Sequence, residues 1–402
     1  MKSFASLLAL ASLAASTPLS FYENNQFPIG GSQQIEAEEL LSSYPGVSLD
    51  LNERRLVQLE GQAPAWVSEL DKINMKAAGL RFFDVTDFPG SNYQEVPTLR
   101  TKTSYHTPNA TDLVKPVLNK LSTDGPKENL EKFTSFRTRY YRSDTGRESQ
   151  LWLLSKISEI TKDYAPKSLQ DVISISEFKH SWGQNSIIAR INGTSSTDDS
   201  VVILSAHQDS TNMWPFLPAP GADDDGSGSV TILESYRALI ASNFRPVRPV
   251  EFHWYSAEEG GLLGSQAVAA AYADRSANVY AMSQFDMTAW VKAGTREEVG
   301  IITDYTDNSL TEFNKKLVDL YLDIPYVETK CGYACSDHAS WGKAGYPSTF
   351  TIESSFENSN KHIHSTQDRI DISEEFSFDH MLEFSKLGVA FAIELGGWSK
   401  KD

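Results

Sequence analysis

The chain has 402 residues, of which 40% are hydrophobic and 22% are charged, a composition typical of globular proteins and unlike disordered, collagenous or coiled-coil chains. The formal net charge is −17, and such an acidic surface repels phosphate backbones and anionic lipids. The composition therefore disfavours nucleic-acid binders and peripheral membrane proteins, and two cysteines exclude a disulfide-rich miniprotein and a multi-cysteine zinc module.

Residues 1–16 are typical of a secretory signal peptide. Lys2 is followed by a short apolar run from Phe4 to Ala15 and by small residues that suit cleavage near Ala15 to Thr17. The run is too short to span a bilayer, which takes ~18 apolar residues, and no later stretch is that long. We therefore predict a secreted, extracellular protein. The sequons at Asn109 and Asn192 are compatible with glycosylation in that compartment.

Residues 17–90 differ in composition from the remainder of the chain. They hold eleven acidic and five basic residues, and their apolar spacing predicts helices at 33–41 and 64–78. Phe82 and Phe83 form an apolar pair near the end of the segment that could anchor it, and turn-forming residues cluster at 87–92. In a secreted chain, such a segment suggests a propeptide; an integral N-terminal subdomain is the alternative.

From about residue 93 onward, strand-like and helix-like segments alternate. Strands are predicted at 172–175, 186–191, 201–204, 250–255, 281–285 and 348–352. Helices are predicted at 129–142, 149–163, 227–241, 262–273, 309–322 and 379–395. This alternation predicts an α/β fold with a mixed, largely parallel central β-sheet flanked by helices on both faces. In such sheets, ligands bind beyond the carboxyl ends of the strands.

Acidic residues and histidines follow four of these predicted strands. They are His207, Asp209, the triplet Asp223 to Asp225, Glu258, Glu259, Asp286, His362 and His364. Each has a structural explanation by itself, because an Asp triplet can cap a helix and paired Glu is usually solvated. Gathered at one edge of a sheet, however, they would repel one another or stay unsatisfied unless cations lie among them. Oxygen and imidazole donors without thiolates suit zinc, or less often cobalt or manganese.

Five motifs, in the same order, resemble those of the M28 co-catalytic dizinc aminopeptidases. They are the segments 205–210, 221–228, 256–260, 286–288 and 363–368. The segment 331–341, which reads CGYACSDHASW, narrows the resemblance to the branch of this family that holds bacterial extracellular and fungal secreted leucine aminopeptidases. The resemblance implies a zinc-dependent exopeptidase fold and a catalytic domain at 91–402. Residues 17–90 also resemble the propeptide of the fungal members.

The resemblance implies two zinc ions per chain, bound by His207, Asp224, Glu259, Asp286 and His364. Asp224 would bridge the ions, and His362 receives no ligand role. The residues alone leave open which ion Asp286 completes, whereas in the family it pairs with the first histidine and Glu259 pairs with the second. Two zinc ions and three carboxylates leave one positive charge, which favours a bridging hydroxide.

The remaining roles also follow from the resemblance. Glu258 would be the general base, Asp209 would orient the His207 imidazole, and Tyr333 would stabilise the tetrahedral oxyanion. Cys331 and Cys335 would form a local disulfide, with two free buried thiols as the alternative. An apolar pocket for the substrate side chain would be lined by Met287, Ile302, Cys331, Cys335, Ile352, Phe356 and Ile363.

Together these features predict a secreted metallo-exopeptidase that removes hydrophobic, leucine-like N-terminal residues from peptides with a free N-terminus. We expect a monomer without nucleic-acid or membrane partners. Three alternatives share the fold: a single-zinc glutaminyl cyclase, a carboxypeptidase-like enzyme that would need a basic residue for the C-terminal carboxylate, and a non-catalytic relative that would lack ligands.

Overall fold

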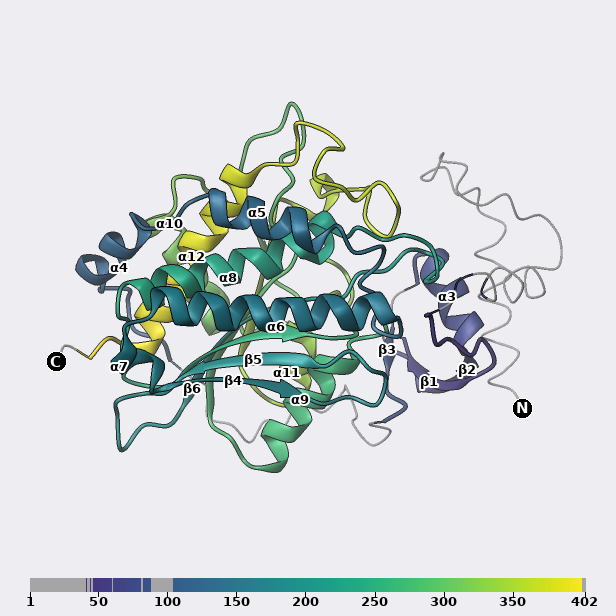
Figure 1. Cartoon of the computed structure of the whole chain (residues 1–402), viewed down its shortest axis with the longest axis horizontal. Coiled ribbons are helices and arrows are strands. Elements are labelled where there is room, and N and C mark those ends of the chain that lie inside the picture. The colour runs from purple at the N-terminus through teal and green to yellow at the C-terminus, as the bar shows by residue number, and fades with distance from the viewer. Residues whose placement is uncertain are drawn as a thin grey trace. The chain divides into compact units, whose positions relative to one another are not determined.

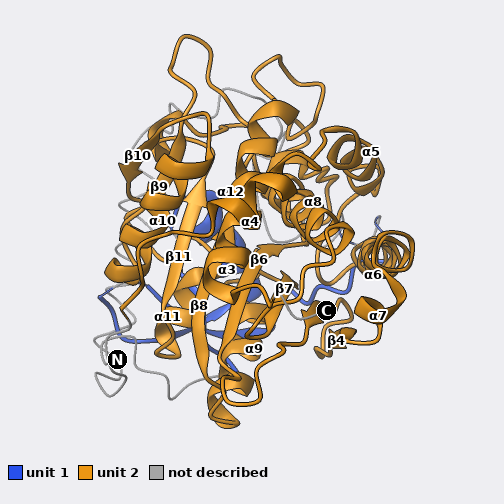
Figure 2. Ribbon diagram, turned by 90° about the vertical axis from the view of Figure 1, so that its left-hand side faces the viewer, with its two compact units in different colours: residues 1–89 blue, residues 90–402 orange. Residues whose placement is uncertain are grey.

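The computed structural model describes residues 41, 44, 46–59, 61–80, 82–87 and 104–399. The predicted signal peptide, the predicted helix at 33–41 except its last residue, and the turn formers at 88–92 lie outside these residues. The chain, drawn whole in Figure 1, divides into two compact units, residues 1–89 and 90–402, which Figure 2 colours separately. This division falls beside the boundary expected from composition, while the proteolytic removal of the first unit stays a prediction.

The described residues of the first unit form a small antiparallel sheet in the order β2-β1-β3, together with the helix α3. The elements are β1 (Arg54–Gln58), β2 (Ala65–Ser68), α3 (Glu69–Ala77) and β3 (Phe83–Asp84). The prediction of a helix from 64 onward was wrong for residues 65–68, because Trp66 and Val67 pair with Leu56 and Arg55 of β1. The helix starts only after Ser68, whose hydroxyl caps the backbone N–H of Asp71.

A buried ion cluster connects the sheet and the helix of this unit. The Asp84 carboxylate lies 2.7 Å from Arg55 Nε and 2.8 Å from Lys72 Nζ. Burial raises the pKa of Asp84, but the charges of Lys72 and Arg55 outweigh it and lower that pKa to about 2. The carboxylate therefore stays ionised in the folded unit at all but strongly acidic pH.

The second unit is built on an eight-stranded sheet in the order β10-β9-β11-β8-β6-β7-β5-β4. The strands are β4 (Ile173–Phe178), β5 (Ser186–Ile191), β6 (Val201–His207), β7 (Val250–Tyr255), β8 (Val279–Phe285), β9 (Val299–Ile302), β10 (Tyr326–Thr329) and β11 (Ser348–Ile352). The four central strands β11, β8, β6 and β7 are mutually parallel. The pairs β7–β5, β5–β4 and β11–β9 are antiparallel. The predicted mixed, largely parallel sheet is confirmed.

Helices cover both faces of this sheet (Figures 1 and 2). They are α4 (Thr111–Leu118), α5 (Asp124–Phe133), α6 (Asp144–Tyr164), α7 (Lys167–Gln170), α8 (Gly228–Ala241), α9 (Leu263–Asp274), α10 (Asn308–Tyr321), α11 (His338–Lys343) and α12 (Phe378–Gly396), with short turns η1 (Ala222–Ser227) and η2 (Phe356–Asn358). All residues of β6 are buried, with Leu204 in the core beneath α8 and α12 and Ile203 in the core beneath α9 and α11. This explains the uninterrupted apolar run of that strand. No helix among the described residues is long and apolar enough to cross a membrane.

The predicted helix at 129–142 was wrong in its second half. The helix α5 ends at Phe133, and the next residues run as an irregular segment in which Thr138 pairs with Ala219. Backbone groups of this segment bond to side chains distant in sequence, as Arg139 N–H does to Ser210 Oγ. Tertiary contacts thus override a helical pattern there. The short elements β9, β10, α4, α7 and α11 were not predicted.

Candidate metal centre and active site

The order of the central strands brings the predicted site residues to one edge of the sheet. His207 is the last residue of β6, Glu258 and Glu259 follow the end of β7, and Asp286 comes directly after β8. Because β8, β6 and β7 are parallel neighbours, their carboxyl ends meet at this edge. His364 arrives from the segment that follows β11 and η2.

The three consecutive aspartates of η1 point in different directions. Asp225 accepts hydrogen bonds from the backbone N–H groups of His207, Gly228 and Met287, at 2.9 to 3.1 Å. Asp223 accepts from Ser227 Oγ at 3.0 Å and from Asn360 Nδ2 at 3.0 Å.

Only the middle carboxylate, that of Asp224, faces the two histidines. Its Oδ1 lies 3.1 Å from His207 Nε2, and its Oδ2 lies 2.9 Å from His364 Nε2. Each oxygen of one carboxylate thus has a different imidazole opposite it.

Asp224 belongs to two groups of potential metal ligands. His207, Asp224 and Asp286 form one group, and Asp224, Glu259 and His364 form the other, with the ligand atoms of each group within 4.8 Å of one another. His207 Nε2 lies 3.7 Å from Asp286 Oδ1, and His364 Nε2 lies 3.2 Å from Glu259 Oε2. Of the two pairings left open by the residues, the structure has Asp286 with His207 and Glu259 with His364.

The environment of His207 leaves one ring nitrogen for a cation. Nδ1 lies 3.1 Å from the backbone carbonyl of Asp209, which makes it the donor and leaves the lone pair on Nε2. Nε2 is buried between the two carboxylates and makes no hydrogen bond. A buried nitrogen lone pair beside carboxylate oxygens needs either a proton or a cation. The donor set therefore fits a metal ion.

Glu258, the predicted base, differs from Glu259 in that its carboxylate has no partner among the described residues. Among the described residues, the Glu258 carboxylate accepts no hydrogen bond and forms no ion pair, while that of Glu259 faces His364. The Glu258 and Glu259 N–H groups donate to the Asp209 carboxylate at 3.0 and 3.2 Å. Asp209 was predicted to orient His207; its carboxylate lies 3.5 Å from Nδ1 and its carbonyl is closer. Asp209 therefore fixes both the imidazole and the backbone of the glutamate pair.

The pKa values at this edge reflect crowded, buried carboxyl groups. Burial raises the pKa of Asp225 and of Asp286, and desolvation together with Glu259 raises that of Glu258 against the opposing charge of His207. For Asp224, burial would also raise the pKa, but the adjacent His207 and His364 imidazoles hold it well below its usual value. The site gathers more negative charge than its own side chains neutralise.

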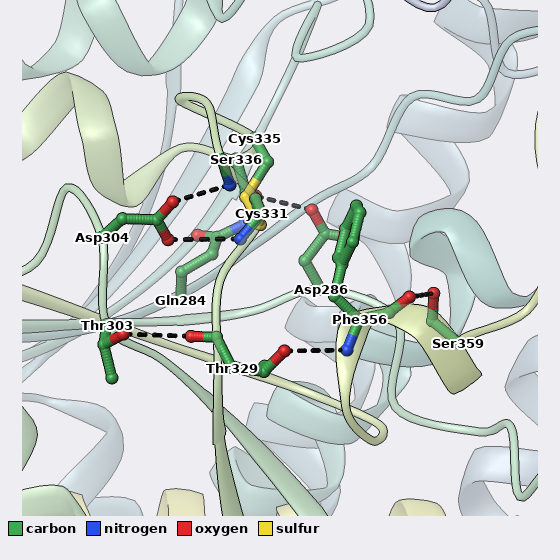
Figure 3. The surroundings of a disulfide bond; sticks show 11 residues. Gln284, Asp286, Thr303, Asp304, Thr329, Cys331, Cys335, Ser336, Phe356 and Ser359 are labelled. Carbon is green, nitrogen blue, oxygen red and sulfur yellow. Dashed lines mark hydrogen bonds between the residues drawn. A yellow bond between two sulfur atoms is a disulfide. The ribbon is translucent and has the colours of Figure 1, made fainter.

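The predicted disulfide is confirmed: Cys331 and Cys335 are bonded, with an S–S distance of 2.02 Å. Figure 3 shows this bridge with Asp304 on one side and Asp286 on the other. The Asp304 carboxylate accepts the N–H groups of Cys331 and Gly332. Ser336, the next residue, donates its hydroxyl to Asp286 Oδ2 at 2.6 Å. The bridged loop is thus tied to one of the candidate ligands.

The residues predicted to line the substrate pocket lie together. Met287, Ile302 and Ile352 are buried in one apolar cluster with Phe350, and the residues packed against it are Cys331, Cys335, Phe356 and Ile363. Phe350 was not predicted. The cluster adjoins both candidate metal groups, since Met287 follows Asp286 and Ile363 precedes His364.

The remaining predicted residues are placed as follows. The Tyr333 ring lies 6.2 Å from that of Phe356, beside the apolar cluster. The ring centres of His362 and Trp290 are 5.5 Å apart, and His362 belongs to neither group of potential metal ligands. Asn109 and Asn192 are both exposed.

Sequence reasoning assigned no role to several residues that hold this site. Asp368 accepts the N–H groups of Asp223 and Asp224 at 2.9 and 3.1 Å, and Glu353 accepts those of Trp290 and Asn360 at 2.8 and 2.7 Å. The place of Asp368 in the motif 363–368 could have indicated its role. The position of Glu353 directly after the strand β11 could have indicated its role in the same way.

Comparisons with known proteins agree with this geometry. Residues 186–386 match the profile of peptidase family M28. Leucine aminopeptidase 1 of Colletotrichum graminicola is 50% identical over 86% of this chain and 86% of its own length. Leucine aminopeptidase 1 of Coccidioides posadasii is 43% identical over 98% of this chain and 99% of its own length. The crystal structure of the LapA aminopeptidase of Legionella pneumophila superposes with a TM-score of 0.74, at 31% identity, over 85% of this chain and 98% of that one.

Proposed function

The chain belongs to peptidase family M28, a family of metallo-exopeptidases that hydrolyse peptide bonds, and we propose that it is a secreted dizinc aminopeptidase that removes leucine-like N-terminal residues from peptides. One observation carries this proposal: the two oxygens of Asp224 each face a histidine of a different donor group. A shared carboxylate between two such groups is what a pair of neighbouring metal ions requires. The names of the curated relatives support the activity.

The ligands in this proposal are His207, Asp224 and Asp286 for one zinc ion and Asp224, Glu259 and His364 for the other. Nitrogen and oxygen donors in sets of three leave room for a further ligand in a tetrahedral site, which is typical of catalytic rather than structural zinc. Zinc ions bound here would supply a water of lowered pKa, polarise the scissile carbonyl and hold the substrate's free amine.

Glu258 is the general base in this proposal. Its carboxylate is not engaged with any described residue, and the hydrogen bond from its N–H to Asp209 fixes its position in the backbone. It can therefore take the proton of the attacking water and pass it to the leaving amine. Tyr333 would donate its hydroxyl to the oxyanion, because its loop is held beside the apolar cluster by the disulfide.

The apolar cluster would receive the side chain of the N-terminal residue. Its aliphatic, aromatic and sulfur-containing side chains suit leucine-like and aromatic residues, since burial of an apolar side chain contributes roughly 1.5 to 3 kcal/mol. In the same proposal, residues 1–16 are a signal peptide, residues 17–90 are a propeptide, the mature enzyme is a monomer, and the exposed Asn109 and Asn192 accept glycans.

Metal analysis combined with substrate comparison tests this function. The purified protein should contain close to two zinc ions per chain, hydrolyse a leucyl chromogenic amide, and lose turnover on addition of a chelator. The N-acetylated leucyl amide should not be hydrolysed, because an aminopeptidase needs the free amine. One bound metal with cyclisation of an N-terminal glutaminyl peptide would instead identify a glutaminyl cyclase.

A further inference from the structure

The segment that connects His207 to the aspartate triplet is held at both ends by a single side chain. This connecting loop, residues 208–221, begins directly after one candidate ligand and ends shortly before Asp224. Arg139, in the irregular segment after α5, donates from Nε to the carbonyl of Gln208 at 2.9 Å. Its Nη2 donates to the carbonyl of Gly221 at 2.8 Å, and its Nη1 donates to that of Pro220. One guanidinium thus joins the first residue of the loop to the last two.

A second set of hydrogen bonds closes the loop alongside the guanidinium. The N–H of Arg139 donates to Ser210 Oγ at 3.0 Å, and Ser210 Oγ donates to the carbonyl of Ala219 at 2.8 Å. Gly221 leaves the space for this arrangement, because a Cβ there would lie 2.4 Å from Ser210 Cβ and 2.9 Å from Arg139 Nη2. The middle of the loop reaches the other histidine, since Met213 N–H donates to the carbonyl of His364 at 3.0 Å.

Arg139 is an unusual side chain to find in this position. It is fully buried, stacks over the Phe133 ring at 4.2 Å from the ring centre, and forms no ion pair among the described residues. Burial lowers its pKa to about 10, against the opposing charges of Asp368, Asp209, Asp225 and Asp224. The group therefore stays charged at neutral pH. A buried cation is costly unless its donors are satisfied, and here they are used on the two ends of one loop.

The geometry assigns Arg139 as a positioning residue of the metal centre: by clamping the two ends of the connecting loop, it fixes the separation between His207 and Asp224. This inference rests on the proposed metal sites. Arg is suited to the task because its planar fork reaches acceptors in several fixed directions, whereas the compact ammonium of Lys cannot span both ends. Partners that orient ligands in this way typically change metal affinity by about 10- to 100-fold when they are lost.

The test uses the Arg139→Lys variant, which keeps the charge and loses the fork. Its control is Arg248→Lys, because Arg248 also joins distant segments: it donates to Asp198 and to the carbonyl of Leu395. Arg248 lies just before β7, at the end of that strand opposite to the site. Zinc affinity of the apoprotein is measured for both ions by competition with a chelator, together with the melting temperatures of apo- and zinc-bound protein and kcat and KM on a leucyl amide.

Arg139→Lys should bind at least one zinc ion about 10-fold or more weakly, and kcat should fall more than KM rises. The melting temperature gained on adding zinc should shrink, because this gain depends on the metal affinity. Arg248→Lys should keep the parental zinc affinities. If Arg139→Lys does not fold, Ser210→Ala, which removes only the parallel link, should show a smaller loss of zinc affinity in the same direction.

The inference would be overturned if the folded Arg139→Lys or Ser210→Ala protein bound zinc as tightly as the parent does. Arg139 would then be a purely structural residue, even if the melting temperatures of the apo- and zinc-bound protein both fell. A parent protein that fails to bind two ions would instead refute the proposed function. The two failures are therefore distinguishable.

Discussion

Replacement of Glu258 by Gln is the most direct test of the assigned chemistry. The change preserves the size of the side chain and removes only its ability to accept a proton. The Asp209 carboxylate bonds to the backbone N–H of this residue, so the hydrogen bond survives the substitution. Because Glu258 belongs to neither donor group, both metal sites should also survive.

The expected magnitude follows from the loss of one proton transfer. General-base catalysis contributes about 10²- to 10⁴-fold, which corresponds to roughly 3 to 5 kcal/mol of transition-state stabilisation. Folding stability should not fall, since the carboxylate makes no hydrogen bond or ion pair with any described residue and a neutral amide avoids the cost of burying a charge. We therefore expect turnover to fall at least ~10²-fold while zinc content stays near two per chain.

The assay measures kcat on a leucyl chromogenic amide, zinc per chain and the melting temperature for the parent and three variants. Glu131→Gln, an exposed position on α5, is the matched control for loss of a surface carboxylate. Glu259→Gln should lose metal as well as activity, which separates a ligand from a base. A Glu258→Gln protein with full metal and activity within a few-fold of the parent would show that another group accepts the proton.

Four other changes test further parts of the structure. Asp224→Ala should abolish binding of both zinc ions, because this carboxylate belongs to both donor groups, and retention of one tightly bound ion would show that it does not bridge. The N-terminal unit should keep the enzyme latent or assist its folding, so cleavage between residues 88 and 93 should raise activity; a fully active secreted protein that begins near residue 17 would contradict this. Double replacement of Cys331 and Cys335 by Ser should lower turnover more than melting temperature, because so short a loop restricts the unfolded chain little; unfolding at ambient temperature, with activity lost only in proportion, would make the bridge a structural staple. The Asp84 carboxylate has a pKa of about 2 when folded, against 3.8 as the ordinary value, so it stabilises the N-terminal unit above pH ~4 by about 2 kcal/mol and loses that contribution as pH falls toward 2. Hydrogen exchange of the strands of this unit should therefore accelerate toward pH 2 in the parent and not in Asp84→Asn.

The parts of the fold that the sequence predicts well are those with a strong local signal. The strand at 250–255 and the helix at 309–322 have regular apolar patterns, and the structure has β7 at 250–255 and α10 at 308–321. The strand β2 at 65–68 was hidden inside an apparent helix, because its pairing with β1 is not visible in the local pattern. Short strands such as β9 and β10 carry too few residues for a periodicity to be recognised.

The candidate ligands could be predicted because each follows a strand and is of a recognisable residue type. The residues that hold the ligand-bearing segments in place could not be predicted. Arg139 lies within a stretch whose apolar spacing predicts a helix, and nothing local distinguishes it from a solvated surface arginine. Its role depends on carbonyl groups of residues 208, 220 and 221, which are far away in the chain. Backbone acceptors leave no trace in the residue types, so a side chain that binds them has no sequence signature.

The aspartate triplet shows the same limit within one motif. A run of three carboxylates indicates a cation or a helix cap, yet only Asp224 faces the histidines, while its two neighbours bind N–H and side-chain donors of other segments. The division follows from the backbone of η1, which departs from helical geometry at Asp224 and Asp225 and so aims successive side chains apart. Replacing either outer aspartate should therefore weaken zinc binding through a displaced Asp224, whereas replacing Asp224 removes the ligand itself.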